Sequence, residues 1–459
     1  MERAEACMLY RKMYERIERF YEEQSNKAMM ITGARQVGKS YIVDKYGESN
    51  FESYIKIDFI DTPGYISLFD GVKSSDDILV RLSAEFGDKM KPGKTLIFFD
   101  EVQECPELIT QIKYLVQEGS YSYILSGSLL GTVMRDIRSV PVGYLSIARM
   151  YPMDFEEFII ANGVGENVIS SLKESFESLV PVDSYIHEKM MELFRLYLIV
   201  GGMPASVRTY LETKNLSTVA GIQTEILNLY REDIAKYDKE DKLYLQEIFD
   251  LIPSELNSKN KRFILKNLNQ YTKFSKFENS FIWLRDAGVA LPAYVADEPV
   301  VPLVFSKSSN LFKLFINDVG LLAAMYGNGI QLKLLKGEAE INYGAVYENA
   351  AAQELAAHGY PLYYYNNKKR GEVDFLTEDN GTVVPVEIKS GKDYYRHAAL
   401  DNIMDVEEYG LKRGYVLCNG NIEVNRNIVT MPIYMLMFIQ KRQLQDDAIY
   451  EIDISGLMG

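Results

Sequence analysis

An octet typical of phosphate-binding loops lies near the start of the chain. The residues GARQVGKS fit the pattern G-x-x-x-x-G-K-[ST], with Gly33, Gly38, Lys39 and Ser40 at the fixed positions. The glycines let backbone N–H groups curl around phosphate oxygens, and the helix that follows adds its positive N-terminal end. Lys39 is expected to bridge the β- and γ-phosphates, and the Ser40 hydroxyl to ligate Mg²⁺. The predicted phosphate site comprises Gly33, Ala34, Arg35, Gln36, Val37, Gly38, Lys39 and Ser40.

Two carboxylates follow an apolar run in LIFFDEVQ. Asp100 and Glu101 at the end of a buried strand are costly unless they take part in chemistry. Asp100 is placed to hold the Mg²⁺ through water, and Glu101 to polarise the water that attacks the γ-phosphate. The alternative is that these acids form a structural salt bridge. ATP is the predicted nucleotide, because the guanine-reading motif N-K-x-D is absent from the sequence.

Other polar groups near this site give weaker signals. Ser126 and Ser128 end a further apolar run, YILSGS, where a hydroxyl could either sense the γ-phosphate or serve as a cap. An arginine that completes the site in the transition state could be Arg135, Arg138 or Arg149. The sequence does not choose among these three arginines.

A second group of charged residues lies in GEVDFLTEDNGTVVPVEIKSGK, residues 371–392. Alternation along two short strands puts Asp374 on one strand, and Glu387 and Lys389 on one face of the next. Metal-dependent phosphodiester hydrolysis needs carboxylates that fix Mg²⁺ and a cation beside the attacking water. Asp374 and Glu387 are therefore candidate metal ligands, joined by Glu348 from the helical stretch upstream, and Lys389 is the candidate cation. The alternative is a surface hairpin with a Glu/Lys cross-strand pair.

These groups need a fold that brings them together. Residues 8–25 have helical spacing, and the short apolar runs AMMIT, YIKIDF, TLIFFDEV and YILSGS alternate with helical stretches. This alternation predicts an α/β domain with a parallel sheet covered by helices on both faces. Residues 165–238 are predicted to be mostly helical. Three short helices between about residues 240 and 290, followed by strand-like LPAYV and LVFS, favour a winged helix-turn-helix, with a small helical lid as the alternative.

Composition limits the kinds of partner that are expected. The 459 residues carry a net charge of −15, which argues against broad coating of nucleic acid. Residues 256–278 nevertheless hold five lysines and one arginine against one glutamate, a local charge of +5 that could contact DNA or form a solvated basic face. Three widely separated cysteines, no apolar core of a signal peptide and no apolar run long enough to span a bilayer predict a cytoplasmic protein without a membrane segment.

Taken together, the motifs resemble those of AAA-type ATPases of bacteria and archaea that carry a C-terminal restriction-endonuclease-like domain. The resemblance covers nearly the whole chain, from about residue 15 to residue 420, and its motifs are GARQVGKS, FFDEVQ, LSGS, YPMDFEEF, GGMP, INDVGLL, GAVYENAAAQEL and GEVDF with PVEIKSG. Two departures stand out. Ser126-Gly127-Ser128 occupies the sensor position where AAA proteins commonly have asparagine, and Val373 replaces the proline that precedes the aspartate in many nucleases of this fold.

The sequence pattern and the resemblance together divide the chain into five expected parts. These are a leading helix (1–25), a P-loop AAA-like ATPase domain (26–160), a helical lid (161–238), a winged helix-turn-helix (239–305) and a PD-(D/E)xK nuclease-like domain (306–459). The candidate residues named above occupy all the ATPase and nuclease positions that this family is expected to have.

Two functions are compatible with these parts. In the first, an ATPase uses its nucleotide cycle to position DNA for Mg²⁺-dependent cleavage by the C-terminal domain. In the second, an ATP-driven switch binds DNA or a protein partner, and the nuclease-like fold is kept for binding only. ATP and Mg²⁺ are the expected cofactors in both, and assembly into an oligomer or with a protein partner is compatible with either.

Overall fold

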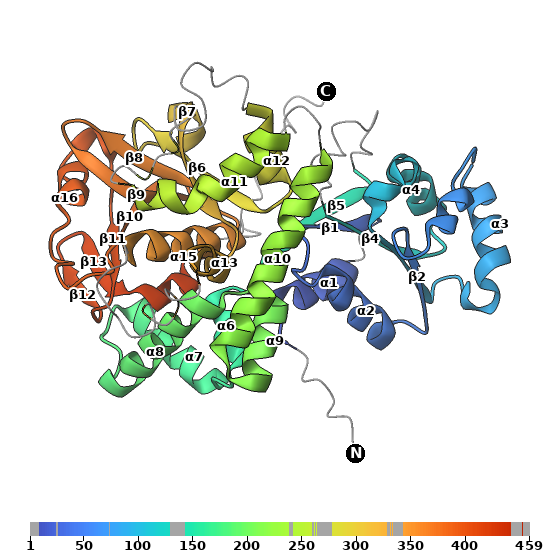
Figure 1. The fold of residues 1–459 in the computed structure, drawn as a ribbon, viewed down its shortest axis with the longest axis horizontal. Coiled ribbons are helices and arrows are strands. Elements are labelled where there is room, and N and C mark those ends of the chain that lie inside the picture. Colours follow the sequence, from blue (N-terminus) through green and yellow to red (C-terminus); the bar gives the residue numbers. More distant parts are fainter. Residues whose placement is uncertain are drawn as a thin grey trace.

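The computed structural model describes residues 9–23, 26–72, 74–128, 143–237, 242–258, 261, 263, 278–327, 331, 333, 343–441 and 452. Two sheets lie on either side of a long central helix, α10, with further helices packed beside them (Figure 1).

The first sheet is entirely parallel and confirms the predicted α/β class. Its strands pair in the order β2-β3-β4-β1-β5. Successive side chains of β3 point to opposite faces, so that Leu96 and Phe98 join one core while Ile97 and Phe99 join another. A strand buried on both faces has a continuous apolar run, as residues 96–99 (LIFF) show. The strands are β1 (Ala28–Thr32), β2 (Ser53–Asp58), β3 (Thr95–Asp100), β4 (Ser122–Gly127) and β5 (Leu145–Arg149).

Helices cover both faces of this sheet. α1 (Lys12–Glu22) and α2 (Lys39–Asn50) contribute to the core that contains Phe98, whereas α3 (Ser75–Phe86) and α4 (Pro106–Glu118) contribute to the core that contains Phe99. The sheet therefore presents the carboxyl ends of its parallel strands, where the P-loop and the acids at the end of β3 lie, at one edge.

A helical region follows, as the sequence predicts. The long helix α10 lies between the two sheets (Figure 1). In the described part of the chain, no single helix is long and apolar enough to cross a membrane, while α8 and α9 would meet the length and composition criteria only as a pair bent by 120°. The helices are α6 (Phe155–Ala161), α7 (Glu166–Ser178), α8 (Ser184–Val200), α9 (Pro204–Thr213), α10 (Leu216–Tyr237), α11 (Lys242–Asn257) and α12 (Glu278–Asp286).

The second sheet is mixed and has the order β12-β13-β11-β10-β9-β8-β6-β7. Helix α15 is buried along nearly its whole length and contacts β7, β10 and β6; its many alanines suit such close packing. The elements are β6 (Ala290–Ala296), β7 (Lys307–Ile316), α13 (Val319–Met325), α15 (Tyr343–Ala357), β8 (Tyr363–Asn367), β9 (Gly371–Asp379), β10 (Thr382–Ile388), α16 (Ala398–Met404), β11 (Gly414–Cys418), β12 (Glu423–Asn425) and β13 (Ile428–Pro432).

The region predicted as a winged helix differs from expectation in one element. LVFS, expected as a strand, is the 3₁₀ helix Leu303–Ser306. Because Ala296 of β6 pairs with Lys307 of β7, this segment belongs to the connection between two antiparallel strands. β6 also pairs with β8, so it is part of the second sheet. Most of the basic segment 256–278, including the second predicted helix, lies outside the described residues.

Asp318 ties the helical region to the second sheet. Its carboxylate caps α13 by accepting a hydrogen bond from Leu321 N (2.9 Å), and it also accepts one from Gly202 N (2.6 Å), just before α9. The side chain is fully buried. A Cβ at Gly201 would lie 2.2 Å from Asp318 Oδ1, so glycine is needed there.

We expect Asp318→Ala to lower the free energy of unfolding by about 3 kcal/mol, since it removes a cap and leaves a buried N–H unpaired. Asp183→Ala is the matched control, because Asp183 caps α8 through Tyr185 N and Ile186 N but is exposed. It should cost only about 1 kcal/mol. Urea unfolding measures both values, and equal losses would contradict a linking role for Asp318.

Candidate functional site

The loop between β1 and α2 has the backbone conformation of a phosphate cradle. Gly33, Gln36 and Gly38 have φ angles of 148°, 67° and 95°. A Cβ at Gly33 would lie 2.2 Å from Met150 O, so the backbone admits only glycine there. Lys39 is buried, and its Nζ donates to Gly33 O (3.1 Å) and Ala34 O (2.9 Å). Burial lowers the pKa of Lys39, and the charges of Glu101 and Asp100 oppose that shift.

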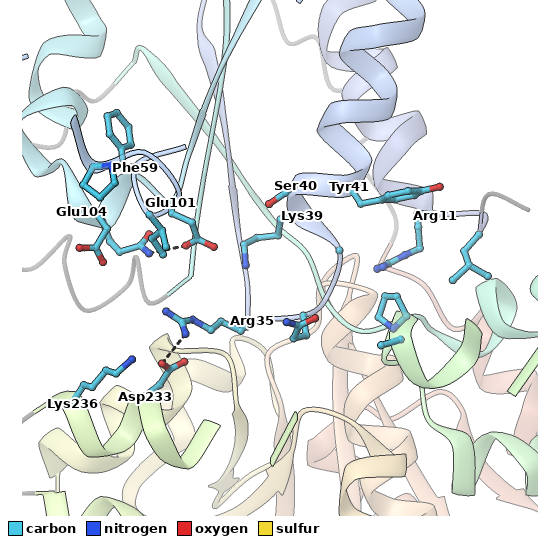
Figure 2. A pocket seen from close by; sticks show the side chains of 18 of the residues that line it. Arg11, Arg35, Lys39, Ser40, Tyr41, Phe59, Glu101, Glu104, Asp233 and Lys236 are labelled. Carbon is cyan, nitrogen blue, oxygen red and sulfur yellow. Dashed lines mark hydrogen bonds and ion pairs between the residues drawn. The ribbon is translucent and has the colours of Figure 1, made fainter. Parts of the chain in front are cut away.

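The two acids at the end of β3 have different surroundings. Asp100 is almost fully buried, accepts a hydrogen bond from Ser126 Oγ and forms an ion pair with Lys56 Nζ at 3.2 Å. For Asp100, this ion pair is the structural salt bridge that the sequence leaves open as an alternative to a role in chemistry. Glu101 instead faces the cavity beside Lys39 (Figure 2).

Glu101 is held by hydrogen bonds from two neighbours. Its Oε2 accepts from Gln103 Nε2 (2.7 Å) and Ser128 Oγ (3.1 Å). Burial raises its pKa, but the charge of Lys39 and these hydrogen bonds outweigh that effect, so its pKa lies below the ordinary glutamate value. The carboxylate is therefore ionised at neutral pH and free of an ion pair in the described part of the chain. Its backbone is left-handed (φ 55°), a strained conformation typical of functional sites.

A cavity of about 1230 Å³ lies over the loop. Figure 2 shows Lys39 and Ser40 between Glu101 on one side and Arg11 and Tyr41 on the other. The cavity is large enough for a nucleotide. Its walls come from distant parts of the chain: Leu9 and Arg11, the loop and Tyr41, residues after β2 and β3 such as Phe59, Glu101 and Glu104, the start of α9 (Pro204, Ala205, Arg208), and Asp233, Lys236 and Trp283.

Two contacts to the loop have no motif in the sequence. From α10, Asp233 Oδ1 forms an ion pair with Arg35 Nη1 at 3.0 Å, and Tyr230 Oη donates to Arg35 O at 3.3 Å (Figure 2 shows the ion pair). The Tyr230 hydroxyl in turn accepts from Asn317 Nδ2 (3.2 Å), which follows β7. From the segment before α1, the buried Arg11 donates to Val37 O at 2.7 Å. Helix α10 therefore links the loop to the second sheet.

The candidate transition-state arginines are only partly described. Arg149 Nη2 donates to Arg285 O at 2.7 Å, beside Gly288, whose Cβ would lie 3.0 Å from Ala34 N. Arg149 thus connects the P-loop side of β5 to the C-terminal end of α12. Arg135 and Arg138 lie outside the described residues.

The C-terminal candidates lie around one point of the second sheet, but lysines lie among them. Asp374 Oδ2 accepts from Ile388 N (2.9 Å), and Lys389 Nζ donates to Glu387 Oε1 (2.7 Å). Burial and the charge of Asp374 raise the pKa of Glu387 to about 8. Glu348 is paired with Lys261 and Lys313.

The residues around this point do not fit a metal ion as they are arranged. Among the described residues, no group of three or more Asp, Glu, His or Cys side chains is placed to hold one. The predicted metal set Glu348, Asp374 and Glu387 is close in space, and the lysine ammonium groups stand where a cation would bind.

Comparison with family models identifies the kind of domain that contains the first sheet and its loop. Residues 25–159 match the family model of an AAA domain, and residues 191–332 and 343–436 match two models that are each described as a domain of unknown function. No curated protein matches the chain. The loop geometry, the acids after β3 and this match define an AAA-type P-loop ATPase domain, a class whose fold implies nucleotide binding.

Solved structures give weaker likenesses. A Walker-type ATPase of Pyrococcus abyssi is 14% identical with a TM-score of 0.41, over 70% of this chain and 96% of that one. Cdc6p of Pyrobaculum aerophilum is 11% identical with a TM-score of 0.27, over 73% and 97%. A Pif1 helicase of Bacteroides is 14% identical with a TM-score of 0.22, over 42% and 50%. The assignment therefore depends on the family model and the geometry of the loop.

Proposed function

We propose that this chain hydrolyses ATP with Mg²⁺ at the P-loop, with Lys39 and Glu101 as its principal polar groups. One observation carries the proposal: the ionised, hydrogen-bonded Glu101 carboxylate and the Lys39 ammonium face the same cavity beside the phosphate cradle. A carboxylate in this position can orient and deprotonate a water, while Lys39 neutralises terminal phosphate charge. The direct test is release of phosphate from ATP by the unsubstituted chain.

The remaining site residues take supporting roles in this proposal. Backbone N–H groups of residues 33–40 bind the phosphates. The Ser40 hydroxyl, and Asp100 through water, would hold Mg²⁺, which supplies further neutralisation of the phosphate charge. Apolar and aromatic side chains of the cavity wall, among them Leu9, Tyr41 and Pro204, suit the base. Ser128 acts as a positioning residue, because it touches Glu101.

The whole chain is best described as an ATP-driven switch with a C-terminal domain used for binding. The domain division inferred from the sequence, with its winged helix-turn-helix and nuclease-like fold, is part of this proposal, with β6 counted in the C-terminal sheet. The connection from Arg35 through Tyr230 to Asn317 supports coupling between the loop and the second sheet. DNA or a protein is the partner whose binding would follow the nucleotide state.

We expect Asp233→Asn to tighten ATP binding about threefold, because it frees Arg35 to face the phosphates and removes a negative charge from the cavity wall. Fluorescence titration with a labelled ATP analogue measures the change. Glu232→Gln is the matched control, since the neighbouring Glu232 is exposed, and it should leave the affinity unchanged. Weaker binding by Asp233→Asn would show that the ion pair holds the loop in its binding conformation.

A further inference from the structure

We propose that the acidic cluster of the second sheet is filled by lysine ammonium groups in place of a divalent cation, so that the C-terminal domain does not cleave nucleic acid by a metal-dependent route. We define this cluster as Glu348, Glu372, Asp374 and Glu387. The inference goes beyond the proposed ATPase function and does not depend on it.

Lys313 is the central cation of the cluster. It lies on β7, and its side chain is fully buried. Its Nζ is 2.8 Å from Glu372 Oε1, 3.4 Å from Glu348 Oε2 and 3.7 Å from Asp374 Oδ1. An ammonium has three N–H donors, and three carboxylates from α15 and β9 surround this one. The Lys313 ammonium therefore contacts the same carboxylates that a metal ion would otherwise bind.

Two further lysines offset most of the remaining negative charge. Lys261 pairs with Glu348, and Lys389 pairs with Glu387 at 2.7 Å. Among the described residues, four carboxylates thus face three ammonium groups, which leaves a formal charge of −1 when all seven groups are ionised. Buried carboxylates of this kind would repel one another if no cation were present, and the lysines remove that repulsion.

A divalent ion would have to displace Lys313, and the structure opposes this. Mg²⁺ requires carboxylate oxygens at about 2.0–2.1 Å in near-octahedral geometry, and a neighbouring ammonium repels it. The Lys313 side chain is fully buried against the ring of Tyr364 (5.0 Å to its centre), so its displaced ammonium would be left without a carboxylate partner and away from water. Leaving a buried charge unpaired is strongly unfavourable.

The test is Mn²⁺ binding by the nucleotide-free chain, followed through the loss of the electron paramagnetic resonance signal of free Mn²⁺. The unsubstituted chain and Asp374→Asn should bind the same amount of Mn²⁺, because any ion held at the P-loop is common to both. Lys313→Met keeps the length of the side chain but removes its charge. It should gain roughly one Mn²⁺ per chain, and Mn²⁺ should raise its lowered melting temperature by several degrees.

Lys307→Met is the matched control, because Lys307 lies on the same strand and is exposed; it should gain no Mn²⁺. Mn²⁺ binding by the unsubstituted chain that Asp374→Asn abolishes would overturn the proposal, and this comparison needs no Lys313 variant to fold. A folded Lys313→Met chain that gains no Mn²⁺ would also overturn it.

Discussion

Lys39→Ala is expected to weaken ATP binding about 100-fold, or roughly 2.7 kcal/mol, and to abolish turnover. The ammonium of Lys39 is buried and, among the described residues, donates only to carbonyls of the loop itself, so it is available for the terminal phosphates. No other lysine or arginine in the described part of the loop is placed in this way, since Arg35 is paired with Asp233. Isothermal titration with ATP and Mg²⁺ measures the loss.

Lys45→Ala is the control for this substitution. Lys45 lies on the same helix and is half exposed, and its one ion pair in the described part of the chain is with the nearby Glu48 at 3.8 Å. It should bind ATP as tightly as the unsubstituted chain does. If both variants lost affinity equally, the effect would belong to the stability of α2 and not to a phosphate contact.

Glu101→Gln should reduce the turnover number about 100-fold while ATP affinity changes by less than about threefold. The amide has nearly the same shape as the carboxylate but cannot accept a proton. Because the pKa of Glu101 lies below its ordinary value, the unsubstituted carboxylate stays ionised at neutral and mildly acidic pH. Turnover should therefore not fall through protonation of this group until the pH drops below the ordinary glutamate range.

Glu104→Gln is the matched control, since Glu104 lines the same cavity but is exposed. It should turn over ATP at the unsubstituted rate. Turnover by Glu101→Gln at that same rate would remove Glu101 from the mechanism and leave the site a nucleotide-binding one.

The phosphate site was predictable because its residues are contiguous. A strand, a glycine-rich loop and a helix occupy adjacent positions, and a loop of fixed length between them permits few conformations. The acids after β3 were predictable for a related reason: an apolar run that ends in two carboxylates identifies the end of a buried parallel strand.

The contacts around that loop were not predictable, because they join residues far apart in the sequence. Arg35 and Asp233 come from separate elements, and nothing in the residues near Asp233 distinguishes it from other acids on α10. The contact of Arg11 was not predictable either. The sequence places Arg11 only within a leading helix, whereas in the structure its side chain donates a hydrogen bond to Val37 O.

The surroundings of the C-terminal cluster could not be predicted from the sequence for a different reason. Lys313 lies in LFKLFI, where a charged residue between apolar ones suggests an exposed strand position. The pairing of β6 with β8, which are far apart in the sequence, and the packing of α15 on the sheet bury it instead among acids from β9 and α15. The strand prediction for LVFS failed because the reversal between β6 and β7 overrides a local preference for strand.

Release of phosphate from ATP by the unsubstituted chain, measured with Mg²⁺ and again with an excess of EDTA, tests the central claim most directly. The proposed site predicts steady release with Mg²⁺ and none with EDTA. A folded chain that binds no ATP, or that releases phosphate equally under both conditions, would contradict it.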